Sequence, residues 1–229
     1  KKFLEKYVTV NTIRRRLGEE LAKSEPLIEK IKEEREKYII VPVPSTPIPA
    51  AEAMAEILGI PIKGGIRKKE HIVGNRRGFI EKPNGRVKIM SNKYDVIYEV
   101  TKGMRVIVVE DSIVRGETSK IISKLLKYGG EAEEVHLRST CPPIIAPCFY
   151  GIDFPTADEL IASRFNSIEE AEKEVAKING FNSVHYQTLE GLLNALGMKE
   201  NECCLACLTE KYPTFFGQKR FEEILKRKV

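Results

Sequence analysis

The stretch Val108-Val-Glu-Asp-Ser-Ile-Val-Arg-Gly-Glu-Thr-Ser119 decides the fold of this chain of 229 residues. It begins inside Met104-Arg-Val-Ile-Val-Val109, a run of β-branched residues that predicts a buried strand. An amphipathic helix should follow and end at Gly129-Gly130. Its apolar positions, which we expect to face inward, are Ile121, Ile122, Leu125 and Leu126. Because Val135-His-Leu-Arg138 then predicts another strand, the order strand, helix, strand favours a parallel sheet with a right-handed crossover.

Weaker patterns on both sides continue the same alternation. Predicted helices are one capped by Asn11, one starting at Pro26, an Ala-rich one at 50–58, one at 189–196 and a tail helix at 221–228. Predicted strands are 38–43, 60–66 and 183–186, with a hairpin near 79–80 and 87–89. We therefore expect an α/β fold whose central, mostly parallel sheet is flanked by helices.

The composition is that of a folded protein with a sizeable core. Apolar residues make up 42% of the chain and charged residues 31%, which argues against disorder. No apolar run approaches the roughly 18 residues of a membrane helix, and no signal-peptide pattern opens the chain, so we expect a cytoplasmic location without membrane contact. The chain begins at Lys1 rather than at Met, which suggests a fragment or a processed chain.

A basic segment accounts for the net charge of +5. Residues 63–77 hold six positive side chains and one negative side chain, so the remaining residues sum to zero. This distribution does not suggest a nucleic-acid partner, but it favours a local anionic ligand. A solvated surface loop is the alternative.

The turn after the central strand combines groups that suit a phosphorylated sugar. Gly116 allows close backbone approach, and Thr118 and Ser119 open a helix whose free N–H groups suit a phosphate. The adjacent carboxylates of Glu110 and Asp111 suit ribose hydroxyls, or a Mg²⁺ that bridges the sugar to a second phosphate. The alternative is that this acidic pair only caps the helix.

This turn resembles the phosphoribosyl-diphosphate (PRPP) signature of type I phosphoribosyltransferases, and most closely that of their glutamine-dependent amidotransferase branch. The resemblance extends over nearly the whole chain. Further matching segments are Asn11-Thr-Ile-Arg-Arg-Arg-Leu-Gly18, Pro142-Pro-Ile144, Pro147-Cys-Phe-Tyr-Gly-Ile-Asp153, Asp158-Glu-Leu-Ile-Ala162 and Cys204-Leu-Ala-Cys-Leu-Thr-Glu-Lys-Tyr-Pro-Thr214. It implies a type I fold with a small hood and a C-terminal helical tail. The implied segments are linker helices at 1–37, a phosphoribosyltransferase domain at 38–196 and a cysteine segment with a tail helix at 197–229.

The resemblance assigns roles to individual residues. Glu110 and Asp111 would hold the ribose hydroxyls and Mg²⁺. The loop around the 5′-phosphate would be Ser112, Ile113, Val114, Arg115, Gly116, Glu117, Thr118 and Ser119, with Glu117 directed to solvent. Ser45 and Thr46 would contact the pyrophosphate, although the family usually has an Asp between the Pro and the hydroxyl residues, whereas Pro44 here precedes Ser45 directly.

The implied reaction is displacement of pyrophosphate from PRPP by ammonia, giving phosphoribosylamine at the start of purine synthesis. It requires positioning and charge stabilisation more than acid–base chemistry. The basic segment 67–79 lies where the family has a mobile lid, so Arg76 and Arg77 are the expected catalytic cations, ahead of Lys68 and Lys69. The three histidines form no cluster, and we expect His136 and His185 to be structural.

The resemblance also implies a glutaminase partner and a homo-oligomer. In the family an N-terminal glutaminase domain, with an N-terminal Cys as nucleophile, supplies the ammonia. The first cysteine here is Cys141, so the glutaminase is expected to be a removed domain or a separate subunit.

Cys204-Leu-Ala-Cys207 has the spacing of metal ligands, although ordinary cytosolic cysteines are the alternative. Some family members carry a [4Fe-4S] cluster, and Cys148, Cys204 and Cys207 match three of its four ligands. The fourth would precede Lys1, and Cys141 or Cys203 could replace it only by rearrangement. The resemblance therefore predicts an incomplete or labile site with a structural or oxygen-sensing role.

Three other functions stay open. The chain could be a phosphoribosyltransferase that uses a nucleobase, or a PRPP-binding regulator or partner subunit without turnover. It could also be an iron–sulfur or zinc scaffold whose loop only caps a helix.

Overall fold

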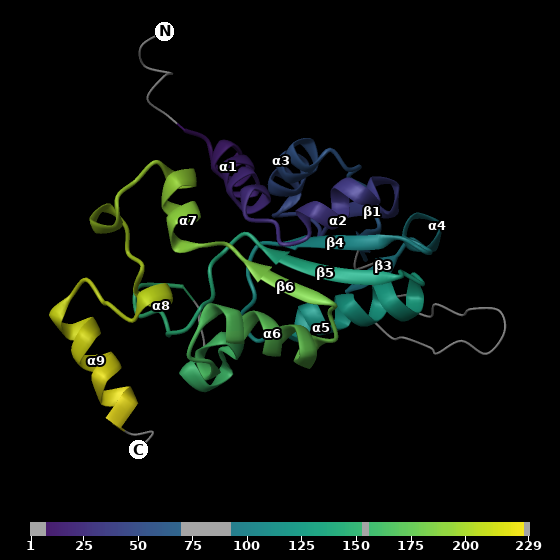
Figure 1. Cartoon of the computed structure of the whole chain (residues 1–229). Coiled ribbons are helices and arrows are strands. Elements are labelled where there is room, and N and C mark those ends of the chain that lie inside the picture. Colours follow the sequence, from purple (N-terminus) through teal and green to yellow (C-terminus); the bar gives the residue numbers. More distant parts are fainter. Residues whose placement is uncertain (1–7, 70–92, 153–155, 227–229) are drawn as a thin grey trace, which may run out of the picture.

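A computed structural model describes residues 8–69, 93–152 and 156–226, arranged as in Figure 1. Its centre is a four-stranded parallel sheet with the strand order β1-β4-β5-β6. These strands are β1 (Tyr38–Pro42), β4 (Arg105–Glu110), β5 (Glu134–Ser139) and β6 (Ser183–Tyr186). A separate antiparallel pair consists of β2 (Ile66–Lys68) and β3 (Tyr94–Val96). The expected α/β fold with a parallel central sheet is confirmed.

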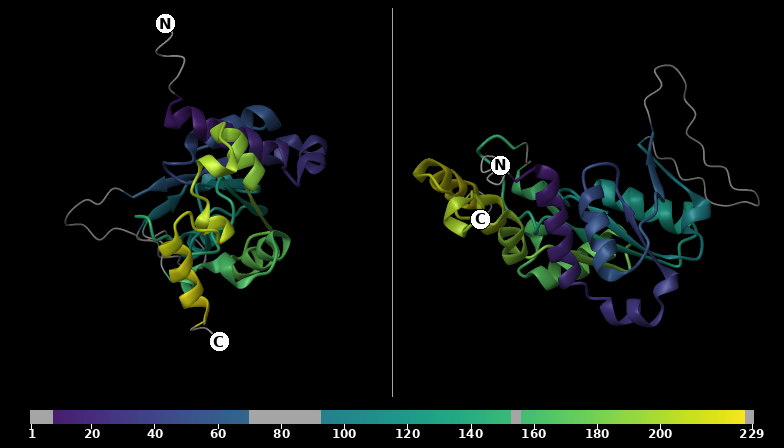
Figure 2. Two further views of the ribbon diagram at one scale, coloured as in Figure 1. Left: turned by 90° about the vertical axis from the view of Figure 1, so that its left-hand side faces the viewer. Right: turned by 90° about the horizontal axis from the view of Figure 1, so that it is seen from above.

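Helices cover both faces of the sheet. Those on one face are α1 (Val10–Lys23), α2 (Ile28–Glu33) and α3 (Ile48–Leu58), and those on the other are α5 (Glu117–Lys124) and α6 (Ile168–Asn179) (Figure 1). The remaining helices are α4 (Tyr98–Thr101), α7 (Leu189–Leu196), α8 (Ala206–Thr209) and α9 (Phe215–Lys226). Figure 2 shows α9 at the opposite end of the molecule from the β2/β3 pair. None of the helices within the described ranges has the length and hydropathy that crossing a bilayer requires.

The alternation of side chains along the strands builds a core on each face. Ile107 and Val109 of β4 pack with Leu21 of α1 and Met54 of α3. Val106 and Val108 point the other way, and their cluster includes Ile122, Leu125, Leu126 and Val175. A smaller apolar cluster at the C-terminal end consists of Ala146, Ala206, Tyr212 and Phe221.

Several predicted elements differ from those observed. The first helix begins at Val10 because Thr9, rather than Asn11, caps it by accepting a hydrogen bond from the Thr12 amide. Residues 60–66 do not form a strand: Ile62 makes an isolated bridge to Ile40, and β2 begins at Ile66. Ile121 was predicted to face inward, but its side chain is 40% exposed, and the other three predicted positions are buried.

At the C-terminal end, α6 was not predicted, and α9 begins at Phe215 rather than at residue 221. The predicted hairpin at 79–89 lies outside the described residues.

Two contacts fasten the N-terminal helices to the rest of the fold. A Cβ atom on Gly18 of α1 would lie 2.0 Å from the Ala50 carbonyl oxygen, so the backbones of α1 and α3 touch directly. After α1, the fully buried side chain of Glu25 accepts two hydrogen bonds from Arg138 of β5, at 2.7 and 2.6 Å. The N-terminal helices and the sheet are therefore one packed unit, and the linker role expected for residues 1–37 stays a prediction.

Candidate active site

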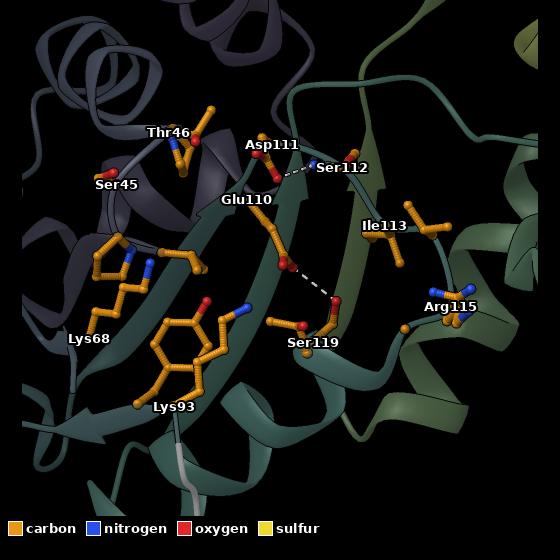
Figure 3. Close-up of a pocket in the computed structure, with 17 residues that line it drawn as sticks. Ser45, Thr46, Lys68, Lys93, Glu110, Asp111, Ser112, Ile113, Arg115 and Ser119 are labelled. Carbon is orange, nitrogen blue, oxygen red and sulfur yellow. Dashed lines mark hydrogen bonds between the residues drawn. The ribbon is translucent and has the colours of Figure 1, made fainter. Parts of the chain in front are cut away.

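A cavity of about 370 Å³ lies at the carboxyl ends of β1 and β4, where open parallel sheets bind their ligands. Its lining joins the turn after β1, the turn after β4 and the base of the β2/β3 pair (Figure 3). The lining residues are Val43, Pro44, Ser45, Thr46, Pro47, Lys68, Lys93, Tyr94, Glu110, Asp111, Ser112, Ile113, Val114, Arg115, Gly116, Thr118 and Ser119. Most predicted PRPP-binding residues are thus brought together around one space.

Glu110 is a buried carboxyl group at the centre of this cavity. It is 6% exposed, and its Oε2 accepts a hydrogen bond of 2.9 Å from the Ser119 hydroxyl. Burial raises the pKa of Glu110 to about 7, while the bond from Ser119 opposes that rise. Nearby Asp111 raises this pKa further and Lys93 lowers it. Because Ser119 lies on the first turn of α5, the hydroxyl of that turn supports the acidic pair.

Asp111 is exposed, and two neighbours bond to it, one to its side chain and one to its backbone. Its Oδ1 accepts a hydrogen bond of 2.9 Å from the Ser112 amide (Figure 3). Its carbonyl oxygen accepts one of 3.2 Å from the Thr140 hydroxyl. The two carboxylates therefore differ in environment: one is buried and paired, and the other faces solvent.

The loop between the acidic pair and α5 requires a glycine at position 116. Gly116 is the N-cap of α5 and has a φ of 78°, which favours glycine. A Cβ atom there would lie 2.8 Å from Asn179 Nδ2 and 2.9 Å from Ile161 Cδ1. Glu117, which was predicted to point to solvent, is exposed and is not part of the cavity lining.

Residues 161 and 159 brace this loop from outside. The Ile161 amide donates to the Val114 carbonyl at 2.9 Å, and Arg115 Nε lies 2.6 Å from Glu159 Oε2. The loop therefore presents free N–H groups at the start of α5 from a fixed backbone, an arrangement suited to an anion.

The opposite wall carries hydroxyl and ammonium groups. In Figure 3, Ser45 and Thr46 lie across the cavity from Ile113 and Arg115, with Glu110 between the two sides. The Pro44–Ser45 peptide bond is cis.

Lysines from the β2/β3 pair complete that wall. Lys68 lines the cavity, whereas Lys69 pairs with Asp95 at 3.2 Å. Sequence reasoning missed Lys93, which reaches the cavity because β3, the strand after it, pairs with the strand that ends at Lys68. The predicted catalytic pair Arg76 and Arg77 lies outside the described residues.

The acidic pair is chemically suited to Mg²⁺. Mg²⁺ commonly takes one or two protein carboxylates and completes its shell with water and substrate phosphates. Glu110 and Asp111 both line the cavity and supply oxygen ligands of this type. The residues present therefore fit this ion, with a phosphorylated substrate as the remaining ligand source.

The cysteines do not form a ready metal site. Cys148, Cys204 and Cys207 were the predicted ligands, but no three His, Cys, Asp or Glu side chains within the described ranges are gathered to hold a metal ion. Burial, together with the nearby Cys148 and Cys204 thiols, raises the pKa of Cys207 to about 11. Burial and nearby Cys207 raise the pKa of Cys141 to about 12. The thiols of Cys148, Cys204 and Cys207 thus lie close enough to influence one another, but they are not gathered into a metal site.

Neither His136 nor His185 lines the cavity, and His71 lies outside the described residues. His136 Nδ1 lies 2.9 Å from Ser183 Oγ, and its Nε2 lies 2.8 Å from Glu134 Oε2. His185 Nδ1 lies 2.8 Å from Glu172 Oε1. Both rings are held by structural contacts of β5 and β6.

The sequence resembles known proteins over nearly its whole length, although no family model matches it. It is 39% identical over 220 residues to an amidophosphoribosyltransferase of Methanocaldococcus jannaschii, covering 96% of this chain and 42% of that protein. It is 38% identical over 212 residues to one of Bacillus subtilis, covering 90% and 41%.

A solved structure gives the same relationship. Glutamine PRPP amidotransferase from B. subtilis, complexed with ADP and GMP, matches with a TM-score of 0.70 and 36% identity, over 90% of this chain and 43% of that chain. The chain thus spans about two fifths of the length of these relatives.

Proposed function

We propose, since the chain is homologous to the amidophosphoribosyltransferases over 220 residues, that it binds PRPP in the cavity and transfers the phosphoribosyl group to ammonia. Pyrophosphate would leave, and phosphoribosylamine would enter purine biosynthesis. The observation that carries this proposal is the shared cavity: the acidic pair, the N-terminus of α5 and the Ser45–Thr46 turn all line it. A sugar with anionic groups at two ends needs these three kinds of partner.

Each wall has a distinct role in this proposal. The loop at Gly116 would hold the 5′-phosphate through backbone N–H groups. Glu110 and Asp111 would orient the ribose hydroxyls and hold Mg²⁺, which when bound would neutralise charge on the pyrophosphate. Ser45, Thr46 and Lys68 would face the pyrophosphate end. Ser119, initially predicted to bind the phosphate, would act mainly through its bond to Glu110.

Rate enhancement would come from positioning and charge rather than from a catalytic base. Ammonia is already a nucleophile, and the cost lies in separating a cationic sugar from an anionic leaving group. Arg76 and Arg77 stay the proposed lid cations that neutralise this charge. The ammonia would come from a glutaminase domain or subunit, and a homo-oligomer stays a prediction, as does an incomplete or labile iron–sulfur site.

The test is pyrophosphate release from PRPP and Mg²⁺, with ammonium or with glutamine as the nitrogen source. We expect release with ammonium and none with glutamine alone. Asp111→Asn should reduce turnover at least tenfold, whereas Glu56→Gln, on the exposed surface of α3, should not. Release with nucleobases but not ammonium would favour a salvage enzyme, and tight PRPP binding without release would favour a regulator. Absence of PRPP binding would refute the proposal.

A further inference from the structure

We infer that Thr140 is a positioning residue that sets the orientation of Asp111, and this inference rests on the proposed function. Thr140 is 6% exposed and is not among the residues that line the cavity. It therefore reaches no substrate and would act only through the acidic pair.

Thr140 is held beside the acidic pair by the sheet itself. The last paired residues of β4 and β5 are Glu110 and Ser139. Thr140 then extends the pairing, since its amide donates to the Glu110 carbonyl at 2.9 Å. This backbone bond does not depend on the side chain and keeps the Thr140 hydroxyl next to the following peptide group.

That peptide group joins Asp111 to Ser112 and is clamped at both ends. Its carbonyl oxygen accepts the hydrogen bond from the Thr140 hydroxyl at 3.2 Å. Its N–H donates to Asp111 Oδ1 at 2.9 Å. Because a peptide group is planar and rigid, fixing the direction of its carbonyl also fixes the direction of its N–H. The Thr140 hydroxyl therefore sets where the Asp111 carboxylate is held, without touching it.

Asp111 needs this support more than Glu110 does. Glu110 is buried and its carboxylate is bonded to Ser119, whereas Asp111 is exposed and follows the last paired residue of β4. Loss of the Thr140 hydroxyl should therefore weaken the binding of the ribose hydroxyls by Asp111, and it should not unfold the protein.

The test replaces the hydroxyl while keeping the branched shape. In the full chain with Mg²⁺, we expect Thr140→Val to raise the Kd and KM for PRPP about fivefold to tenfold, with kcat changed less than twofold. Thr140→Ser should restore the wild-type values. Thr101→Val is the matched control, because it removes another buried threonine hydroxyl, which donates to the Gly130 carbonyl at 2.9 Å before the start of β4. That control should lower stability and leave the Kd unchanged.

A double-mutant cycle separates this role from a general structural one. If Thr140 acts through the Asp111 carboxylate, Thr140→Val should have no further effect on PRPP binding in an Asp111→Ala background. An unchanged Kd in Thr140→Val, or an equal loss in both backgrounds, would overturn the inference. Absence of PRPP binding by the wild-type chain would instead refute the proposed function, and the inference with it.

Discussion

The hydroxyl of Ser119 donates a hydrogen bond of 2.9 Å to the buried carboxylate of Glu110. Ser119→Ala should leave that carboxylate without this partner and raise the KM for PRPP about tenfold, as expected for a bond to a charged group. Ser123→Ala, one turn later in α5, removes a bond to the Gly180 carbonyl and serves as the control. Steady-state kinetics of both variants would decide, and equal KM values would contradict the assigned role.

Gly116→Ala should destabilise the protein by more than the strain of a positive φ alone, because the new methyl group would also meet neighbouring side chains. Gly103 is a matched control, because its φ of 69° is similar but a Cβ there meets nothing within 4 Å. Both substitutions carry the strain of a positive φ, and only the one at Gly116 adds contacts with Asn179 and Ile161. We expect Gly116→Ala to lower the free energy of unfolding by about 1–3 kcal/mol more than Gly103→Ala. Denaturant titrations giving equal values would contradict this.

Breaking the pair between Glu25 and Arg138 should cost more than breaking a surface pair. Both side chains are fully buried, so Glu25→Gln leaves an uncompensated guanidinium charge in the core. The expected loss in free energy of unfolding is about 3–5 kcal/mol. Glu56→Gln, which removes an exposed partner of Arg15, should change it little. Similar unfolding midpoints for the two variants would refute the distinction.

His136 should make the fold sensitive to mild acid. Burial and nearby Arg138 lower its pKa to about 4, while Glu134 and Glu25 oppose the shift. Between pH 6.5 and pH 4 the unfolded chain therefore binds the proton and the folded chain does not. Stability should fall as the pH decreases through this range.

The measurement for His136 is denaturant unfolding at pH 7 and at pH 5. His136→Gln keeps a polar side chain beside Ser183 and Glu134 and cannot take up a proton. The difference in stability between the two pH values should shrink in this variant. An unchanged pH dependence would mean that other groups control the acid response.

Neutralising Arg76 and Arg77 should lower turnover more than PRPP binding. The double change to Gln removes positive charge from the proposed lid. That charge is needed most in the transition state, where the leaving pyrophosphate gains negative charge. An equal charge loss at Lys226 and Arg227 in the tail is the control and should have no effect. Comparable kcat values in the two double variants would contradict a catalytic role for Arg76 and Arg77.

Strong local patterns made the centre of the fold predictable from sequence. β6 and α7 have the predicted bounds, and β4 and β5 each differ from the predicted strands by one residue at both ends. Buried strands and the helices that follow them carry dense apolar runs, which makes them predictable. The strand predicted at residues 60–66 was wrong because Ile62 contacts β1 through one bridge only. The inward orientation predicted for Ile121 was wrong because the buried face of α5 is narrower than the apolar content of the helix suggests.

The candidate site was predictable where its residues are adjacent in the chain. Glu110 and Asp111 precede the phosphate loop directly, so one short segment carries both. Lys93 and Thr140 reach the site region only through strand pairing, in β3 beside β2 and in the extension of β5 beside β4. Strand register is a tertiary property, and the sequence alone contains no local signal for it.

The contact between Gly18 and Ala50 has a mechanical consequence. With no side chain between the two backbones, nothing compressible separates α1 from the first turn of α3. That turn follows the Ser45–Thr46 segment of the cavity wall after one residue, Pro47. Any side chain at position 18 would therefore have to push the first turn of α3 away, and with it the end of the wall proposed to face the leaving group.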